Sequence, residues 1–324
     1  MHFLSRRAAA SAAFAISAAL ALVGCGTTEP GATNADAMDV VVAFYPLEYV
    51  TERVGGDQVH ITNLTQPGAD AHDVALTPRQ VALLSEADLV VYQRGFQPEV
   101  DEAIVQAQPA NVVDMATVVD FHTIDATGSH VHDGADSDGE HTHGEDQHAH
   151  GNLDPHAWLD PTNMVAMTQA TAEALSTARP ASQSAFAANA AALEADLTAL
   201  DESYQEGLAT CERTEFIVSH AAFGYLAERY GLVQIPIRGL TPDNEPSPAR
   251  IAEVQQLAQD HQITTIFYET LVSPAVSESM ARDLNLRTDV LDPLEGLTGQ
   301  SRGDDYLEIM EANLQALQEA SGCL

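Results

Sequence analysis

Seven of the thirteen histidines lie within residues 122–150, a segment that also has seven acidic residues, four glycines and no Lys or Arg. Neutral imidazole is the commonest side-chain metal ligand, so this composition suits loose binding of divalent cations. With few apolar side chains and a high charge it cannot build a core, and we predict a disordered loop at 122–151. The alternative is a solvated loop whose histidines bind nothing. The candidate accessory metal ligands are His122, His130, His132, His141, His143, His148 and His150.

Five further side chains of metal-binding type lie near the ends of predicted strands. His220, Glu269 and Asp292 each directly follow an apolar run in the second half of the chain. His72 lies in a loop after a strand of the first half, and His156 lies at the edge of the His-rich segment. Ligands of open parallel sheets bind just beyond the carboxyl ends of the strands. Each histidine alone also fits a structural role, but their recurrence at strand ends favours a shared metal site.

Two βα-type halves must position these residues. Strands of the first half are predicted at 39–44, 59–64, 88–92 and 110–113, with helices from Pro46, from Thr77-Pro78 and over 99–106. Strands of the second half are predicted at 215–219, 233–237, 264–268 and 288–291, with helices over 221–230, 248–259, 274–286 and 304–320. Apolar strands that alternate with helices predict an α/β fold with two parallel sheets, each covered on both faces.

An Ala-rich stretch, 161–208, separates the two halves. Apolar residues recur at helical spacing within 182–208, which predicts one long, rigid helix that joins the lobes. We therefore expect an N-terminal lobe at 39–181, a linker helix at 182–208 and a C-terminal lobe at 209–324.

The N-terminus has the features of an export signal. Arg6 and Arg7 precede an apolar run at 8–23 that is too short for a comfortable membrane span. Leu22-Val23-Gly24-Cys25 resembles a bacterial lipobox, which implies cleavage before Cys25 and acylation of that cysteine. We expect a lipoprotein signal peptide at 1–24 and a flexible tether at 25–38; the alternative is a secreted protein with a buried Cys25. The sequence leaves Sec and twin-arginine export open.

The formal net charge is −35, and all thirteen basic residues are Arg. Nucleic acids and anionic lipid surfaces are therefore poor partners, whereas cations are good ones.

Besides Cys25 the chain has Cys211 and Cys323. Because an exported protein reaches a compartment that permits disulfides, we predict that these two pair. Two separately buried thiols are the alternative.

The order of several motifs resembles the zinc-binding solute-binding lipoproteins of bacterial metal ABC transporters, in the cluster that also contains manganese binders. The resemblance covers about residues 39–323. It rests on Phe44-Tyr45-Pro46-Leu47, Pro67-Gly68 with His72-Asp73, Asp88-Leu-Val-Val-Tyr92, Asp154-Pro155-His156-Ala-Trp158-Leu-Asp160-Pro161, Ser219-His220-Ala-Ala-Phe223-Gly-Tyr225, Phe267-Tyr268-Glu269 and Leu291-Asp292-Pro-Leu-Glu-Gly296.

The resemblance implies one metal ion bound between the lobes. His72 and His156 would come from the first lobe and His220 from the second. The fourth ligand is Glu269 in the pattern of some members and Asp292 in that of others; Glu269 is preferred here. Three imidazoles and one carboxylate suit the tetrahedral coordination of Zn²⁺. Copper and manganese remain alternatives.

The function implied is high-affinity capture of Zn²⁺ and delivery to an ABC transporter permease for zinc uptake. The protein would be a non-enzymatic monomer, anchored through lipid at Cys25 on the outer face of the bacterial cytoplasmic membrane. Binding of manganese or another divalent metal, or cell adhesion on the same fold, is an alternative. A zinc hydrolase is less favoured, because neither a His-Glu-x-x-His segment nor a nucleophile elbow is present.

Overall fold

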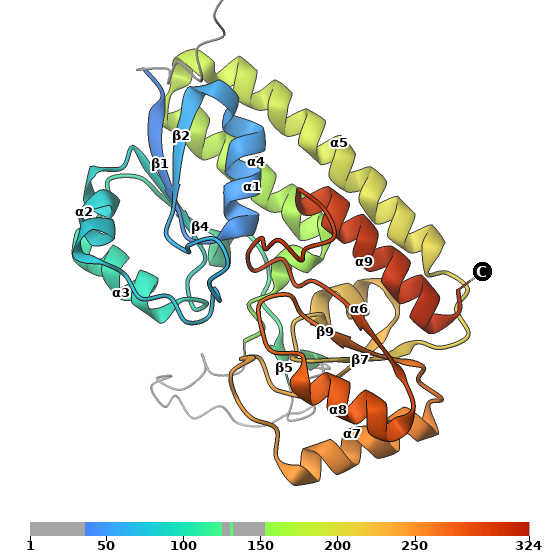
Figure 1. Ribbon diagram of the computed structural model, residues 1–324. Coiled ribbons are helices and arrows are strands. Elements are labelled where there is room, and N and C mark those ends of the chain that lie inside the picture. The colour runs from blue at the N-terminus through green and yellow to red at the C-terminus, as the bar shows by residue number, and fades with distance from the viewer. Residues whose placement is uncertain (1–35, 125–129, 132–152, 324) are drawn as a thin grey trace, which may run out of the picture. The chain divides into compact units, whose positions relative to one another are not determined.

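The computed structural model describes residues 36–124, 130–131 and 153–323, all within one compact unit. Two four-stranded sheets organise these residues (Figure 1). The strand orders are β2-β1-β3-β4 and β10-β9-β7-β8, and every neighbouring pair in both sheets is parallel. The predicted fold class, two parallel-sheet α/β lobes, is confirmed. The predicted signal peptide, Cys25 and most of the tether lie outside the described residues.

The first sheet follows the predicted alternation. Its elements are β1 (Met38–Val42), α1 (Tyr45–Gly55), β2 (Val59–Asn63), α2 (Pro78–Glu86), β3 (Leu89–Tyr92), α3 (Pro98–Ala107) and β4 (Val112–Asp114). The central strands are buried on both faces because helices cover both sides of the sheet, with α2 and α3 on one side in Figure 1. Thr77 and Gln80 form a reciprocal capping box that starts α2.

A pair of long helices follows the first sheet. After the 3₁₀ turn η4 (Ala157–Leu159), the chain forms α4 (Pro161–Ala178) and α5 (Gln183–Gly207). α5 packs against α4 and α1 near its start and against α9 (Tyr306–Ser321) near its end (Figure 1). The buried hydrophobic residues of α5 have the helical spacing expected from the sequence: Phe186, Ala190, Leu193, Leu197, Leu200 and Tyr204. The predicted helix over 182–208 is therefore present.

The second sheet repeats the alternation. Its elements are β7 (Glu215–Val218), α6 (Gly224–Tyr230), β8 (Val233–Pro236), α7 (Pro248–Asp260), β9 (Thr265–Tyr268), α8 (Ala275–Leu284), β10 (Arg287–Val290) and finally α9. The helix predicted from residue 221 starts only at Gly224. Residues 220–223 form a turn instead, in which the Ala221 amide donates to the Gly239 carbonyl at 3.0 Å. This turn carries His220.

A small antiparallel hairpin at the border of the His-rich segment was not predicted. β5 (Thr123–Ile124) pairs with β6 (His130–Val131), and Thr123 also bridges to Leu153. Ile124 is buried, so one apolar side chain at the start of the predicted loop contributes to the packed structure. The loop predicted over 122–151 is therefore β structure at Thr123–Ile124 and His130–Val131.

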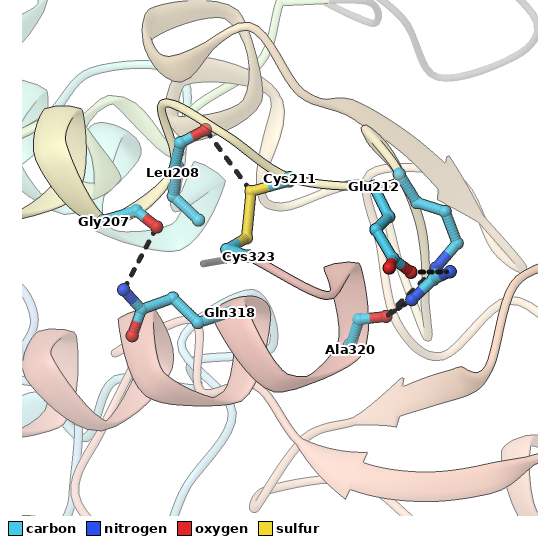
Figure 2. The surroundings of a disulfide bond; sticks show 8 residues. Gly207, Leu208, Cys211, Glu212, Gln318, Ala320 and Cys323 are labelled. Atoms are coloured by element: carbon cyan, nitrogen blue, oxygen red, sulfur yellow. Dashed lines mark hydrogen bonds and ion pairs between the residues drawn. A yellow bond between two sulfur atoms is a disulfide. The ribbon is translucent and has the colours of Figure 1, made fainter.

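Cys211 and Cys323 form a disulfide, as predicted. Figure 2 shows it at the end of α9, near the contact between the Gln318 amide and the Gly207 carbonyl. The Arg213 amide donates to the Ser321 carbonyl in the same region. The bond thus fastens the last helix to the segment that leaves α5. None of the described helices has the length and apolarity to cross a membrane.

Removal of this disulfide by Cys211→Ser with Cys323→Ser should lower the free energy of unfolding by about 4 kcal/mol, because the bond closes a loop with a sequence separation of 112. Urea unfolding of the oxidised wild type and of the double variant would measure the change. Zinc affinity serves as the control and should not change, since neither cysteine is among the candidate ligands. Equal urea midpoints would contradict the prediction.

Candidate metal centre

Four side chains of metal-binding type converge on one point: His72, His156, His220 and Glu295. The Nε2 atom of His156 lies 3.3 Å from the Nε2 atoms of both His72 and His220. Glu295 Oε1 lies 3.3 Å from His72 Nε2 and 3.2 Å from each of the other two Nε2 atoms. All four ligand atoms lie within 4.8 Å of one another.

These distances match the size of a tetrahedral zinc site. With zinc–ligand bonds of about 2.0–2.1 Å, the ligand atoms of a regular tetrahedron are about 3.3–3.4 Å apart. Five of the six separations in the cluster are 3.2–3.3 Å. The cluster is therefore arranged to accept a small tetrahedral cation with little movement of the ligand atoms.

Both halves of the fold supply the cluster. His72 lies in the loop between β2 and α2, and His156 immediately precedes η4. His220 follows β7, and Glu295 lies in the loop after β10. β7 and β10 belong to the second sheet, so two of the four side chains sit beyond the carboxyl ends of parallel strands, where ligands of open sheets bind.

The cluster is almost completely shielded from water. The side chains of His156, His220 and Glu295 are at most 1% exposed, whereas that of His72 is 9% exposed. Burial strengthens the attraction between these groups and a cation, because little solvent screens it. His72 is the ligand candidate nearest to solvent.

Carboxylates orient two of the imidazoles. Asp154 Oδ1 lies 2.7 Å from His156 Nδ1 and also accepts the His156 backbone amide at 3.0 Å. Glu269 Oε1 lies 2.6 Å from His220 Nδ1 and also accepts the Ser219 hydroxyl. A carboxylate holds the proton on Nδ1, which leaves the Nε2 lone pair for a metal. Both Nε2 atoms accordingly face the centre of the cluster.

The same contacts shift the pKa values of these groups in the metal-free protein. Burial favours neutral rings, but Asp154 outweighs it and raises the pKa of His156, and Glu269 raises that of His220 to about 10. Burial would raise the pKa of Glu295, yet the three imidazoles hold it well below its usual range. The metal-free cluster therefore favours a protonated His220 ring beside an ionised Glu295.

The structure places neither Glu269 nor Asp292 in the cluster, although the sequence predicted one of them there. Glu269 lies on the Nδ1 side of His220, away from the centre. Asp292 accepts hydrogen bonds from the Leu294 amide at 2.9 Å and the Ser301 hydroxyl at 2.9 Å. Glu269 therefore supports the imidazole of His220, and Asp292 supports the loop after β10. The fourth converging side chain is Glu295, which the sequence analysis did not select.

Several contacts direct Glu295 toward the imidazoles. Asn313 exchanges two hydrogen bonds with the backbone of Asp292, and the Trp158 indole donates to the Pro293 carbonyl at 2.8 Å. Leu294 has a left-handed backbone, with φ +60°, an unusual conformation for a non-glycine residue. The chain therefore turns sharply just before Glu295. Its signal in the sequence was the Leu291-Asp292-Pro-Leu-Glu-Gly296 motif, one turn beyond the strand end.

The accessory histidines lie elsewhere or outside the described residues. His122 Nδ1 lies 2.8 Å from Glu228 Oε2, its amide donates to the Tyr225 hydroxyl, and its side chain is 31% exposed. His130 is placed only as part of β6. The remaining accessory candidates lie outside the described residues: His132, His141, His143, His148 and His150. Among described residues, the cluster of four is the only group with metal-site geometry.

An acidic cavity of about 710 Å³ extends to Glu295. Carboxylates dominate its charged lining, which also includes one guanidinium, that of Arg53; the acidic residues are Glu48, Glu52, Asp304, Asp305 and Glu295. Such a lining raises the local concentration of cations.

The fold and the site together define the class of protein. It is a two-lobed binding protein, because two parallel α/β halves jointly enclose a buried cluster of ligand-type side chains.

The chain belongs to the ZnuA family: the model of the family described as zinc-uptake complex component A, periplasmic, matches residues 40–320. The family resemblance predicted from the sequence is thus confirmed. The high-affinity zinc uptake system protein ZnuA of Bacillus subtilis is 32% identical over 320 residues, 96% of this chain and 97% of that protein. The zinc-binding lipoprotein AdcA of Streptococcus pneumoniae is 34% identical over 308 residues, 94% of this chain. This chain spans only 59% of the length of AdcA.

Solved structures share the fold. Zn(II)-bound AdcA of S. pneumoniae superposes with a TM-score of 0.72 at 30% identity, over 88% of this chain and 58% of that one. The metal-dependent lipoprotein YcdH of B. subtilis gives 0.71 at 30% identity, over 88% and 99%. The laminin-binding protein Lmb of Streptococcus agalactiae, described as a bifunctional protein with adhesin and metal transporting activity, gives 0.75 at 26%, over 88% and 100%.

Proposed function

We propose that this protein captures Zn²⁺ outside the cytoplasm and delivers it to an ABC transporter permease. The observation that supports this most strongly is the cluster of four side chains: His72, His156, His220 and Glu295. The distances between their ligand atoms match those between the ligand atoms of a tetrahedral zinc site. Membership of a zinc-uptake family and relatives named for zinc binding support the same cargo.

The donor set favours zinc over harder ions. Three imidazole nitrogens and one carboxylate oxygen suit a borderline ion with four ligands, whereas manganese prefers more oxygen ligands. Copper would also bind three imidazoles, and the Irving–Williams order gives it higher intrinsic affinity. We therefore propose zinc as the transported ion, with selectivity over copper supplied by geometry and by metal availability.

We further propose that the protein is not an enzyme. Catalytic zinc sites hold three protein ligands and a water, but here Glu295 fills the fourth corner of the tetrahedron.

The lipobox-like segment at Cys25 and relatives named lipoproteins support lipid attachment on the outer face of the cytoplasmic membrane. A monomer is proposed, since both halves of the site come from one chain.

Adhesion is a second candidate function. The observation that favours it is the likeness to Lmb, whose description combines adhesin and metal transporting activity. An adhesive role would leave the interlobe cluster intact, so it would accompany metal binding rather than replace it.

Zinc titration of a soluble form of the protein from Gly26 onward would test the proposal, with Trp158 fluorescence and elemental analysis as readouts. We expect one tight equivalent that is lost in His220→Ala and kept in a variant that lacks residues 132–150, which retains β5 and β6. Weak binding in the folded deletion variant would instead make the His-rich segment the main site. Tighter retention of Mn²⁺ than Zn²⁺ would reassign the cargo.

A further inference from the structure

The turn that joins β3 to α3, residues 93–97, contacts both ligand-bearing loops of the first half. We call it the Gln93–Gln97 turn. Gln93, Phe96 and Gln97 are 2%, 4% and 2% exposed, although two of them carry polar amides. Buried amides are retained where their hydrogen bonds matter, because desolvation without a partner is costly. The partners of these two amides lie in the metal centre's own loops.

The backbone of the Gln93–Gln97 turn is itself held in place. The Arg94 amide donates to Asp114 Oδ1 at 3.0 Å, and the Gly95 amide donates to Asp101 Oδ2 at 2.9 Å. Gly95 has φ +88°, a conformation that residues with a Cβ rarely adopt. Two carboxylates and a glycine therefore define the direction in which the side chains of this turn point.

Gln93 holds the loop that carries His156. Its Nε2 donates to the Pro155 carbonyl at 2.7 Å, and Pro155 directly precedes His156. Its Oε1 is buried and has no hydrogen-bond partner among the described residues. An apolar side chain of similar size would avoid that unsatisfied acceptor. The single donated bond is therefore what distinguishes glutamine from leucine at this position.

Gln97 holds the loop that carries His72. Its Nε2 donates to the Ala71 carbonyl at 2.9 Å and lies 3.0 Å from the Thr65 hydroxyl oxygen. That hydroxyl in turn donates to the Ala43 carbonyl, at the end of β1, at 2.8 Å. Ala71, the residue before His72, is thus bonded to Gln97 of the turn and is linked through Gln97 and Thr65 to the first sheet.

Phe96 fills the space between the two glutamines. Its ring centroid lies 4.8 Å from that of His72, in edge-to-face geometry, and 6.3 Å from that of His156. It also packs on Trp158, with centroids 5.3 Å apart. One short segment thus contacts both imidazoles or the residues directly before them, without reaching the centre of the cluster.

We propose that Gln93 and Gln97 are positioning residues that set the separation of His72 and His156 and so favour a tetrahedral ion. This inference rests on the proposed zinc site. The two amides act through the Pro155 and Ala71 carbonyls, and the distance they set is the 3.3 Å between the two Nε2 atoms. Loss of either bond lets one imidazole drift, which penalises small tetrahedral ions more than ions that accept looser, higher coordination.

The test uses the mature chain with Gln93→Leu and Gln97→Leu. Zn²⁺ affinity should fall by about 10- to 100-fold, the usual effect of losing an outer contact of a metal ligand. Mn²⁺ affinity should change less than threefold, so the Zn²⁺/Mn²⁺ preference falls with it. The visible absorption of bound Co²⁺ should lose tetrahedral intensity. The matched control is Gln318→Leu, which removes an amide bond to the Gly207 carbonyl and should leave all three readouts unchanged.

Gly95→Ala provides a variant that removes no side-chain contact. A Cβ there would meet nothing within 4 Å, so its effect comes only from strain at φ +88°. It should weaken Zn²⁺ in the same direction, and it tests the inference even if a glutamine variant fails to fold. Unchanged Zn²⁺ affinity in folded variants, or equal losses for Zn²⁺ and Mn²⁺, would overturn the inference. Absence of a tight Zn²⁺ equivalent in the wild type would instead refute the proposed function.

Discussion

Glu295→Gln is expected to weaken zinc binding by about 10²- to 10³-fold. Structural zinc sites with four ligands bind with about 10–16 kcal/mol, so one ligand accounts for roughly 2.5–4 kcal/mol. Glu295 Oε1 lies 3.2–3.3 Å from all three Nε2 atoms, as a fourth ligand should. Competition with a chelator of known zinc affinity would measure the loss in the mature protein.

Two matched variants separate Glu295 from the other carboxylates. Glu269→Gln replaces the carboxylate beside His220 Nδ1 with a neutral amide and should weaken zinc binding by about 10- to 100-fold. Asp292→Asn alters only the support of the loop and should cost less than Glu295→Gln, because Asp292 Oδ1 bonds the Leu294 amide rather than the cluster. Circular dichroism would confirm folding. A greater loss in Glu269→Gln than in Glu295→Gln would reinstate Glu269 as the fourth ligand.

Zinc binding at neutral pH is expected to release protons. Burial alone would lower the pKa of His220, but Glu269 raises it to about 10, so the metal-free ring is protonated at pH 7. A zinc-bound ring must lose that proton. Zinc affinity should therefore rise by about tenfold per pH unit from pH 7 to about pH 9 on account of this ring, and level off above its pKa. Calorimetry in buffers of different ionisation enthalpy counts the protons.

Glu269→Gln is the control for the source of the proton. Without this carboxylate the pKa of His220 loses its main upward influence, so the variant should release about one proton fewer at pH 7 and show a flatter pH profile. His156, whose pKa Asp154 raises, would continue to contribute. Binding heats that do not depend on the buffer in the wild type would show that the rings are already neutral.

The sheets and long helices were predictable because their signals are local. Three consecutive valines in β1 indicate a strand that is buried on both faces. The helical spacing of Phe186, Leu193 and Leu197 in α5 indicates a helix with one buried face. The α6 boundary was predicted too early, because the Ala221 and Ala222 amides pair with Gly239 and His220 carbonyls instead of extending the helix. The β5–β6 hairpin was missed because two-residue strands have no period to detect.

The three imidazoles of the cluster were predictable, but the fourth side chain was not. His220 lies two residues beyond the end of β7, so the strand-end rule selects it. The same rule selects Glu269 after β9, which does lie near the site but contacts the other nitrogen of His220. Glu295 depends on a left-handed Leu294 and on Asn313 from α9, a helix that starts eleven residues after Glu295. The 291–296 motif contains Glu295, but these long-range contacts, which decide that Glu295 and not Asp292 reaches the imidazoles, cannot be read from it.

The Cys211–Cys323 bond makes the second half a covalently closed ring. Every residue from β7 to α9 lies inside that ring. A single cut by an extracellular protease within it would leave both pieces attached, so the severed strands could pair again, whereas a cut in the first half separates the chain in two. Cuts inside the ring would leave the band unchanged on a non-reducing gel but would give two fragments on a reducing gel. The half of the protein that supplies His220 and Glu295 therefore stays covalently connected after a single cut.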